Sequence, residues 1–285
     1  MVLPRARRGY ILLMTLLLIA IAGIALASIE RLSLTRAIEA TRAEEDLRRR
    51  WLWTTTQTTL LAQASQIMED AQADAGQPVV QHLVPLTVGS CQMELTFTDE
   101  QAKPNLNTLW NTRSPEQCQE TLQHLLESTG GGVPFVLQPT PKDLSTLYGE
   151  ATFGRYGQVF PHPEPAVLLG GPGATAGPAA ALTLWGSGQL NFHRATPVSL
   201  REVCAPILGP ADVEKLLSIR QNQPALGTVK LLTLLGVTKE QRTALLGRLT
   251  ERSNCFGLWM VLQDADGKRY RFAVTNGGAM QIDGW

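Results

Sequence analysis

The side chains best suited to catalysis or ligand binding lie in one short pattern, in which Asp99 and Glu100 are followed by Lys103, Asn105 and Asn107. Two carboxylates beside an amine and two amides could transfer protons or bind a metal ion. The same groups could instead shape a loop, because Asn side chains cap helices and satisfy backbone groups in turns. We favour the structural interpretation of this pattern.

Two further patterns could bind a ligand. Asp264 and Asp266 are hard oxygen ligands at a calcium-like spacing, but Asp264-Ala-Asp-Gly is also a strong hairpin signal. The glycine-rich residues 170–173 lack the Gly-Lys-Ser/Thr of a phosphate loop and predict a flexible loop. HExxH, GxSxG and dinucleotide fingerprints are missing from the sequence. We therefore predict no catalytic residue and no required cofactor. Calcium binding by Asp264 and Asp266 is kept as one interpretation of their spacing.

The four cysteines, Cys91, Cys118, Cys204 and Cys255, are widely spaced and form neither a CxxC pair nor a Cys/His cluster. This argues against a zinc site. If the bulk of the chain is exported, they are candidates for one or two disulfides of unassigned pairing. The 25 Lys and Arg residues equal the 25 Asp and Glu residues, so no global charge indicates a nucleic-acid partner.

The elements that must position these residues begin with an apolar segment. Arg5, Arg7 and Arg8 precede residues 10–29, which carry no charge and are long enough to cross a bilayer as a helix. The charge change from basic to slightly acidic places the N-terminus in the cytoplasm and the remaining chain outside. A secretory signal peptide cleaved after Ala27 and a simple single-span anchor are two interpretations of this segment.

The helix is expected to continue well beyond the apolar segment. Residues 24–75 contain neither Gly nor Pro, so one helix on the order of 100 Å long is predicted up to Ala75. Five Thr among residues 54–59 predict a bend or boundary. Residues 70–78 end the helix.

The rest of the chain predicts a mixture of strands and helices. Met93, Leu95 and Phe97 alternate as one face of a strand. The other predicted elements are a helix over 117–128, a hairpin over 182–192, helical units over 199–221 and 228–249, and a hairpin of strands 256–263 and 269–275. We expect this last hairpin to form a sheet with the strand at 93–98. The two helical units are also similar to helix-hairpin-helix modules that bind DNA phosphates, although they carry no basic cluster.

The N-terminal residues resemble those of the type IV pilin and pseudopilin family. A short basic leader ends at Gly9, an aromatic Tyr10 follows, and an apolar segment continues into an amphipathic helix. The resemblance implies that prepilin peptidase cleaves between Gly9 and Tyr10 and that the new N-terminus is methylated. Most members have a Glu five residues into the mature chain, where this sequence has Met14. Its absence is a mark of the K-type minor pseudopilins of type II secretion, and an unrelated anchor would lack it too.

Two internal patterns resemble the general secretion pathway protein K family more specifically. The pattern D-E-x-x-K-x-N-L-N-x-L is matched by Asp99, Glu100, Lys103, Asn105, Leu106, Asn107 and Leu109. The pattern W-G-x-G-x-x-N-x-N-x-A-x-P is matched by Trp185, Gly186, Gly188, Asn191, Ala195 and Pro197, with His193 in place of the second Asn. This substitution puts a ligand role of the second amide in doubt. Members of the family bind calcium.

The resemblance implies an α+β fold with four parts. These are a leader over 1–9, a helix over 10–75, a β part from 76–103 and 253–285, and an inserted mainly helical domain over 104–252. It implies a non-enzymatic protein of the bacterial inner membrane with a periplasmic head. The implied role is initiation and tip capping of the pseudopilus that exports folded proteins. The implied partners are I-type, J-type and major pseudopilins, and no nucleic acid. The alternatives are an anchored binding module and a DNA-binding protein of a competence-type system.

Overall fold

The computed structural model describes residues 6–89, 91–129, 133–139, 153–161, 164–170, 176–264, 267–276 and 279–283. The chain divides into two units after Thr55. The fold is α+β, as predicted, with a long apolar N-terminal helix, a small antiparallel sheet and further helices.

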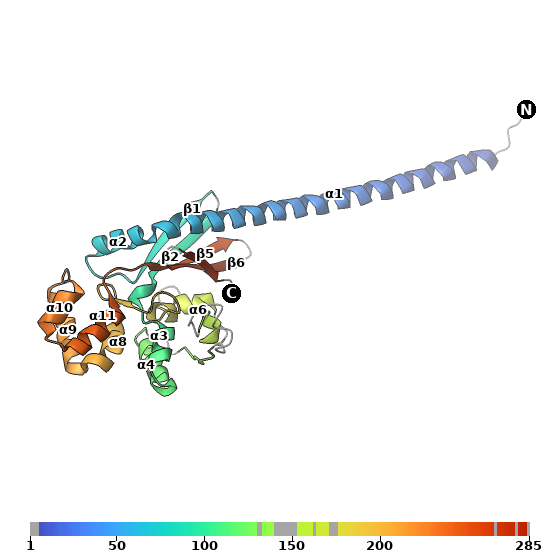
Figure 1. Cartoon of the computed structure of the whole chain (residues 1–285). Coiled ribbons are helices and arrows are strands. Elements are labelled where there is room, and N and C mark those ends of the chain that lie inside the picture. The colour runs from blue at the N-terminus through green and yellow to red at the C-terminus, as the bar shows by residue number, and fades with distance from the viewer. Residues whose placement is uncertain are drawn as a thin grey trace, which may run out of the picture. The chain divides into compact units, whose positions relative to one another are not determined.

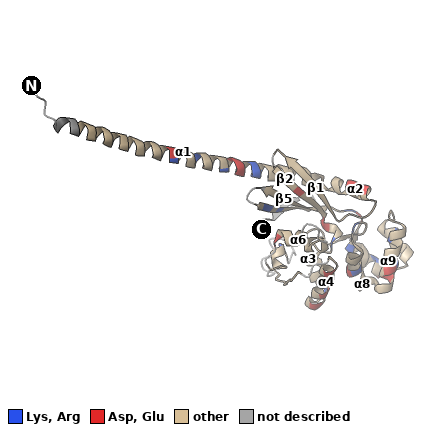
Figure 2. Cartoon of the chain, turned by 180° about the vertical axis from the view of Figure 1, so that it is seen from behind, with Lys and Arg blue, Asp and Glu red and all other residues tan. Residues whose placement is uncertain are grey.

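The first unit is formed by helix α1, which spans Ala6–Leu60 and so continues into the second unit. The large apolar side chains between Tyr10 and Ile29 are exposed, and beyond this apolar part the helix carries charged residues of both signs (Figure 2). The first of these is Glu30. By length and composition this apolar part could cross a membrane, since its most apolar 18-residue window has a mean hydropathy of 2.7.

The helix does not break at the Thr-rich segment. A 3₁₀ turn, η1 (Leu61–Gln63), follows α1, and helix α2 (Ala64–Ala75) continues from it. Thr56 and Gln57 are buried, so packing within the second unit outweighs the weak helix preference of threonine. The predicted boundary therefore lies a few residues too early. Gly76, with a φ of +62°, ends α2.

A five-stranded antiparallel sheet forms the centre of the second unit, in the order β1-β2-β5-β6-β7. Strands β1, β2, β5 and β6 are labelled in Figure 1. Its strands are β1 (Gln81–Val88), β2 (Cys91–Asp99), β5 (Cys255–Asp264), β6 (Gly267–Asn276) and β7 (Ala279–Asp283). Leu95 faces Met260 across the β2–β5 pair, so the predicted pairing of the early strand with the late hairpin is confirmed. The edge strands β1 and β7 were not predicted.

The two faces of the sheet pack against different elements. Helix α2 lies against β1 and β2, and its buried Ala64 and Met68 belong to the same layer as Met93 and Leu95 of β2. On the opposite face, Trp259 and other residues of β5 and β6 pack against the segment predicted as an insertion, residues 104–252, here called the insertion.

The insertion contains two apolar cores. The first includes helices α3 (Leu106–Thr112), α4 (Pro115–Glu127), α6 (Pro165–Leu169) and α7 (Pro178–Ala181), with the 3₁₀ turn η3 (Tyr156–Gln158). The second includes helices α8 (Pro197–Leu208), α9 (Pro210–Asn222), α10 (Thr228–Leu235) and α11 (Lys239–Arg248), with strands β3 (Leu190–Asn191) and β4 (Leu249–Thr250). The predicted helices at 117–128, 199–221 and 228–249 are thus present, the last two as pairs.

The hairpin predicted over 182–192 is wrong. Thr183 forms a parallel bridge with Asn105, whereas β3 pairs in parallel with β4 at Leu190 and Leu249. The two ends of this segment therefore belong to different cores, and its glycine-rich centre connects them. Gly186 and Gly188 have φ angles of +94° and +79°, which only glycine adopts without strain.

Candidate functional site

The pattern from Asp99 to Asn107 lies where the sheet meets the insertion. Asp99 ends β2 and caps the 3₁₀ turn η2 (Glu100–Ala102), because its Oδ1 accepts hydrogen bonds from the backbone N–H groups of Gln101 and Ala102 at 3.0 and 3.1 Å. Its Oδ2 accepts from Ser253 Oγ at 2.7 Å and from Arg194 Nη1 at 3.1 Å. One carboxylate thus joins β2, the insertion and the segment before β5.

Glu100 and Lys103 form an ion pair inside the protein. The Lys103 ammonium donates to Glu100 Oε1 at 2.6 Å and to the backbone carbonyl of Ala179 at 2.8 Å. Glu100 also accepts from Thr98 Oγ1 at 2.5 Å and, through Oε2, from Thr183 Oγ1 at 2.6 Å. Glu100 and Lys103 are almost fully buried. Buried charges persist only when paired and hydrogen-bonded, as both are here.

The two asparagines bind backbone groups, as the structural interpretation predicted. Asn105 caps α3 by accepting from Thr108 N–H at 3.1 Å and donates to the carbonyl of Trp185 at 2.7 Å. Asn107 donates to the carbonyls of Phe153 and Leu184, both at 2.9 Å, and accepts from Phe153 N–H at 2.7 Å. Both side chains therefore satisfy backbone groups of loops that have no strand partner.

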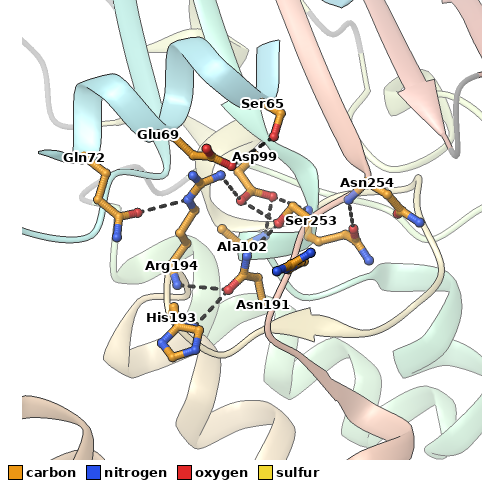
Figure 3. A network of polar contacts seen from close by, with 12 residues as sticks. Ser65, Glu69, Gln72, Asp99, Ala102, Asn191, His193, Arg194, Ser253 and Asn254 are labelled. Carbon is orange, nitrogen blue, oxygen red and sulfur yellow. Dashed lines mark hydrogen bonds and ion pairs between the residues drawn. The ribbon is translucent and has the colours of Figure 1, made fainter. Parts of the chain in front are cut away.

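The second pattern, from Trp185 to Pro197, supplies the other side of this network (Figure 3). Asn191 Oδ1 accepts from the N–H groups of His193 and Arg194, and its Nδ2 donates to Ser253 Oγ at 2.7 Å. His193 makes no side-chain hydrogen bond in the described part of the chain, so the loop does not depend on an amide there. Pro197 is the first residue of α8.

The chemistry of this network is structural. Each carboxylate oxygen of Asp99 and Glu100 accepts at least one hydrogen bond from a protein group, and both side chains are fully buried, so neither carboxylate is exposed to a substrate. Burial raises the pKa of the Asp99 carboxyl, and the bonds from Ser253 and Arg194 oppose that rise. Within the described residues, no group of three or more His, Cys, Asp or Glu side chains could hold a metal ion.

Several participants gave no signal in the sequence. Thr183, Arg194 and Ser253 are separated along the chain from the carboxylates that they bind by 83, 95 and 154 residues. Gly257 belongs to the same set, since a Cβ there would lie 2.5 Å from Thr98 Oγ1 and 2.6 Å from Glu100 Oε1. Of these participants, only Gly257 could have been noticed in the sequence, as a glycine inside the strand predicted over 256–263.

The remaining predicted residues lie elsewhere. Gly9, Tyr10 and Met14 are on α1, where the side chains of Tyr10 and Met14 are exposed. Asp264 ends β5, but its side chain and the whole of Asp266 fall outside the described residues, so the calcium prediction there has no structural description.

All four cysteines are free thiols in this structure. Cys118 and Cys255 lie in the first core and Cys204 in the second, while Cys91 is partly exposed at the start of β2. Burial raises the pKa of Cys118 to about 11 and that of Cys204 to about 12, and it raises the pKa of Cys255 as well.

Comparison with known proteins found similarity to solved structures but none at the level of sequence. No family model matches the chain, and no curated protein matches it. A chain of the GspK-GspI-GspJ complex from the type 2 secretion system of enterotoxigenic Escherichia coli is similar in structure. The match has 16% sequence identity and a TM-score of 0.41, and it covers 85% of this chain and 96% of that chain.

Proposed function

We propose that the chain is a K-type minor pseudopilin of a type II secretion system. It acts in initiation and tip capping of the pseudopilus that exports folded proteins. The proposal assigns no bond chemistry to the protein: its N-terminal helix packs in the membrane and the fibre, and its head recognises other minor pseudopilins of the I and J types and the major pseudopilin.

The observation that carries the proposal is the pattern from Asp99 to Leu109. The pattern resembles that of the general secretion pathway protein K family. Asp99, Glu100 and Lys103 join the end of β2 to the insertion, and the two asparagines hold α3 to loops within the insertion. Side chains that hold segments of the protein together in this way support a rigid, non-catalytic head. The uncharged residues 10–29 after Gly9 supply a second, independent support.

The N-terminal residues determine how the subunit would work. Cleavage after Gly9 by prepilin peptidase would leave a methylated Tyr10 at the cytoplasmic face of the inner membrane, with the head in the periplasm. The Glu present in most pilin-like subunits would pair with the terminal amine of a neighbour in a low-dielectric environment. With Met14 at that place, the subunit needs no neighbour above it, which fits a tip position.

Mass spectrometry of the mature N-terminus tests this proposal. We expect methylated Tyr10 in the native cell. Gly9→Leu should leave the leader attached and abolish secretion, whereas Gly23→Leu, where a side chain would meet no atom within 4 Å, should be processed normally. An N-terminus at Ser28 would indicate a signal peptide, and one at Met1 or Val2 a simple anchor. Either result contradicts the proposal.

A gel mobility-shift assay addresses the DNA-binding alternative. The helix pairs α8–α9 and α10–α11 carry Arg201, which is already paired with Glu214 at 2.6 Å, and only scattered further cations. We expect no shift of a short DNA duplex by the full chain in detergent at physiological salt. A salt-sensitive shift at micromolar protein would favour the DNA-binding alternative instead.

A further inference from the structure

A groove runs between α2 and the α8–α9 pair of the insertion. It consists of a cavity of about 900 Å³ and an adjoining cavity of about 590 Å³. Both are lined by Glu69, Gln72, His193 and Arg194, so the two form one continuous surface. Figure 3 shows these four side chains between α2 and the loop that precedes α8. The network described above uses only the floor of this groove.

The floor of the groove is formed by the guanidinium of Arg194, which hydrogen bonds hold in a fixed position. Arg194 is 8% exposed; its Nε donates to Gln72 Oε1 at 3.0 Å and its Nη1 to Asp99 at 3.1 Å. In the described part of the chain its Nη2 has no hydrogen-bond partner. The Arg194 guanidinium is thus held in place by Nε and Nη1, while Nη2 is left to bind an oxygen acceptor in the groove.

The α9 wall carries a cation that lacks an anionic partner. Arg220 donates through Nη1 to the carbonyls of Phe192 and Ala195 at 2.9 and 2.7 Å, and its guanidinium lies 5.7 Å from the centre of the Phe192 ring. Among the described residues no carboxylate pairs with it, whereas Arg201 on the same groove is paired with Glu214. Burial lowers the pKa of Arg220, which is the penalty an incoming carboxylate would remove.

The opposite wall offers the complementary groups. Among the described residues, Glu69 on α2 accepts a hydrogen bond only from Ser65, at 3.3 Å, and it lines both cavities, so it can accept hydrogen bonds from a ligand. His193 lines both cavities with no side-chain hydrogen bond to a described residue. A small anion would be repelled by Glu69. A polypeptide satisfies both walls, because its backbone N–H groups suit Glu69 and an acidic side chain suits Arg220.

We infer that this groove binds an extended segment of a partner subunit that carries an acidic side chain, which pairs with Arg220 and contacts Arg194. The inference rests on the proposed function, since it identifies the recognition surface of the head. The two adjoining cavities together offer room for several residues of extended chain.

Site-specific photocrosslinking of the full chain in the native cell tests the inference. Benzoylphenylalanine is placed at Ser218 in the groove, at Ala211 on the same helix outside it, and at Trp51 on α1. We expect Ser218, and not Ala211, to crosslink to another subunit with a prepilin-type leader. The captured peptide, sequenced by mass spectrometry, should contain Asp or Glu. Capture of the chain's own second copy, or of a peptide without an acidic residue, overturns the inference.

Charge variants make the test specific. Ser218→Glu adds a negative charge to the groove without removing a buried bond, and it should lower the co-purification of that partner at least fivefold. Ala211→Glu should leave it unchanged. Arg220→Gln should have the same effect as Ser218→Glu, with Arg242→Gln as its control and the melting temperature measured for both. Unchanged co-purification with Ser218→Glu overturns the inference.

The outcomes separate this inference from the proposed function. Crosslinks to pilin-like subunits from Trp51 but none from Ser218 would reject the groove and keep the function. If neither position captures a pilin-like subunit and Tyr10 is not the mature N-terminus, both fail.

Discussion

At the scale of single residues, the Asp99 carboxylate is the point at which three distant segments meet. It accepts bonds from the turn that follows β2, from Arg194 before α8 and from Ser253 before β5. Because Asp99 is fully buried and Arg194 is only 8% exposed, water replaces little of the contact that is lost when either partner is removed. The pair is therefore expected to matter more than a surface ion pair would.

A double-mutant cycle measures this coupling. Asp99→Asn leaves the buried Arg194 without its counter-charge and should lower the free energy of unfolding by about 3 kcal/mol, and Arg194→Gln by a similar amount. The double variant should lose less than the sum, with a coupling of about 1–3 kcal/mol from urea denaturation. The exposed pair Arg201 and Glu214 is the control, with coupling under about 1 kcal/mol. Additive losses at Asp99 and Arg194 would contradict the assigned bond.

A pair of glycines tests the packing around Glu100. In Gly257→Ala the new methyl group would lie within 3 Å of Thr98, Glu100 and Phe272, so we expect a loss of about 1–3 kcal/mol. In Gly247→Ala, on exposed α11, no atom lies within 4 Å, and the variant should gain about 0.5–1 kcal/mol from helix preference. Thermal melting of the two variants and the parent measures these changes in stability. Equal effects of the two substitutions would mean that β5 does not approach Glu100 this closely.

At the scale of elements, local patterns were sufficient where neighbouring residues decide the structure. Ser114 and Pro115 start α4, and the alternation of Met93, Leu95 and Phe97 matches the buried face of β2. The edge strand β1 escaped prediction because Pro85 lies in its centre. Proline is tolerated there because an edge strand has a side that needs no donor.

The candidate site could also be predicted only in part, and for the same reason. The roles of Asn105 and Asn107 as backbone-binding amides could be predicted from residue type, because capping is a local property. Their partners could not, since Trp185 and Phe153 come from segments brought near only by the packing of the first core. The wrong hairpin at 182–192 has the same cause: Thr183 pairs with Asn105, a contact across the chain.

Burial in the two apolar cores predicts how readily each cysteine reacts with an alkylating reagent. Cys118, Cys204 and Cys255 are buried with raised pKa values, so their reactive thiolate form is scarce and shielded. With iodoacetamide at pH 7.5 and no reductant, intact-mass analysis should show one label in the native protein, at Cys91, and four after denaturation. Fewer than four labels in the denatured protein would show that a disulfide forms, contrary to the four free thiols.

At the scale of the whole molecule, α1 has two parts with different surfaces. Residues 10–29 expose apolar side chains with no charge among them, while from Glu30 the same helix carries charges of both signs (Figure 2). A helix with an unbroken apolar surface is stable in lipid because its backbone hydrogen bonds are all internal. The charged side chains from Glu30 onwards would be costly to place in lipid, so we expect that part of the helix to lie in water. The change at residue 30 therefore predicts where the membrane ends.

Paired arginine substitutions test that boundary. Leu18→Arg with Ile21→Arg places two cations near the centre of the apolar part, at a cost of about 5–7 kcal/mol for insertion. We expect most of this variant to be released by alkaline carbonate extraction, whereas the parent stays in the membrane fraction. Leu34→Arg with Ile38→Arg, equally exposed positions of the same helix beyond residue 30, should be retained like the parent. Retention of both variants would mean that the apolar part is not the anchor. Release of both would place the membrane boundary beyond residue 38, because the charged part would then also contribute to insertion.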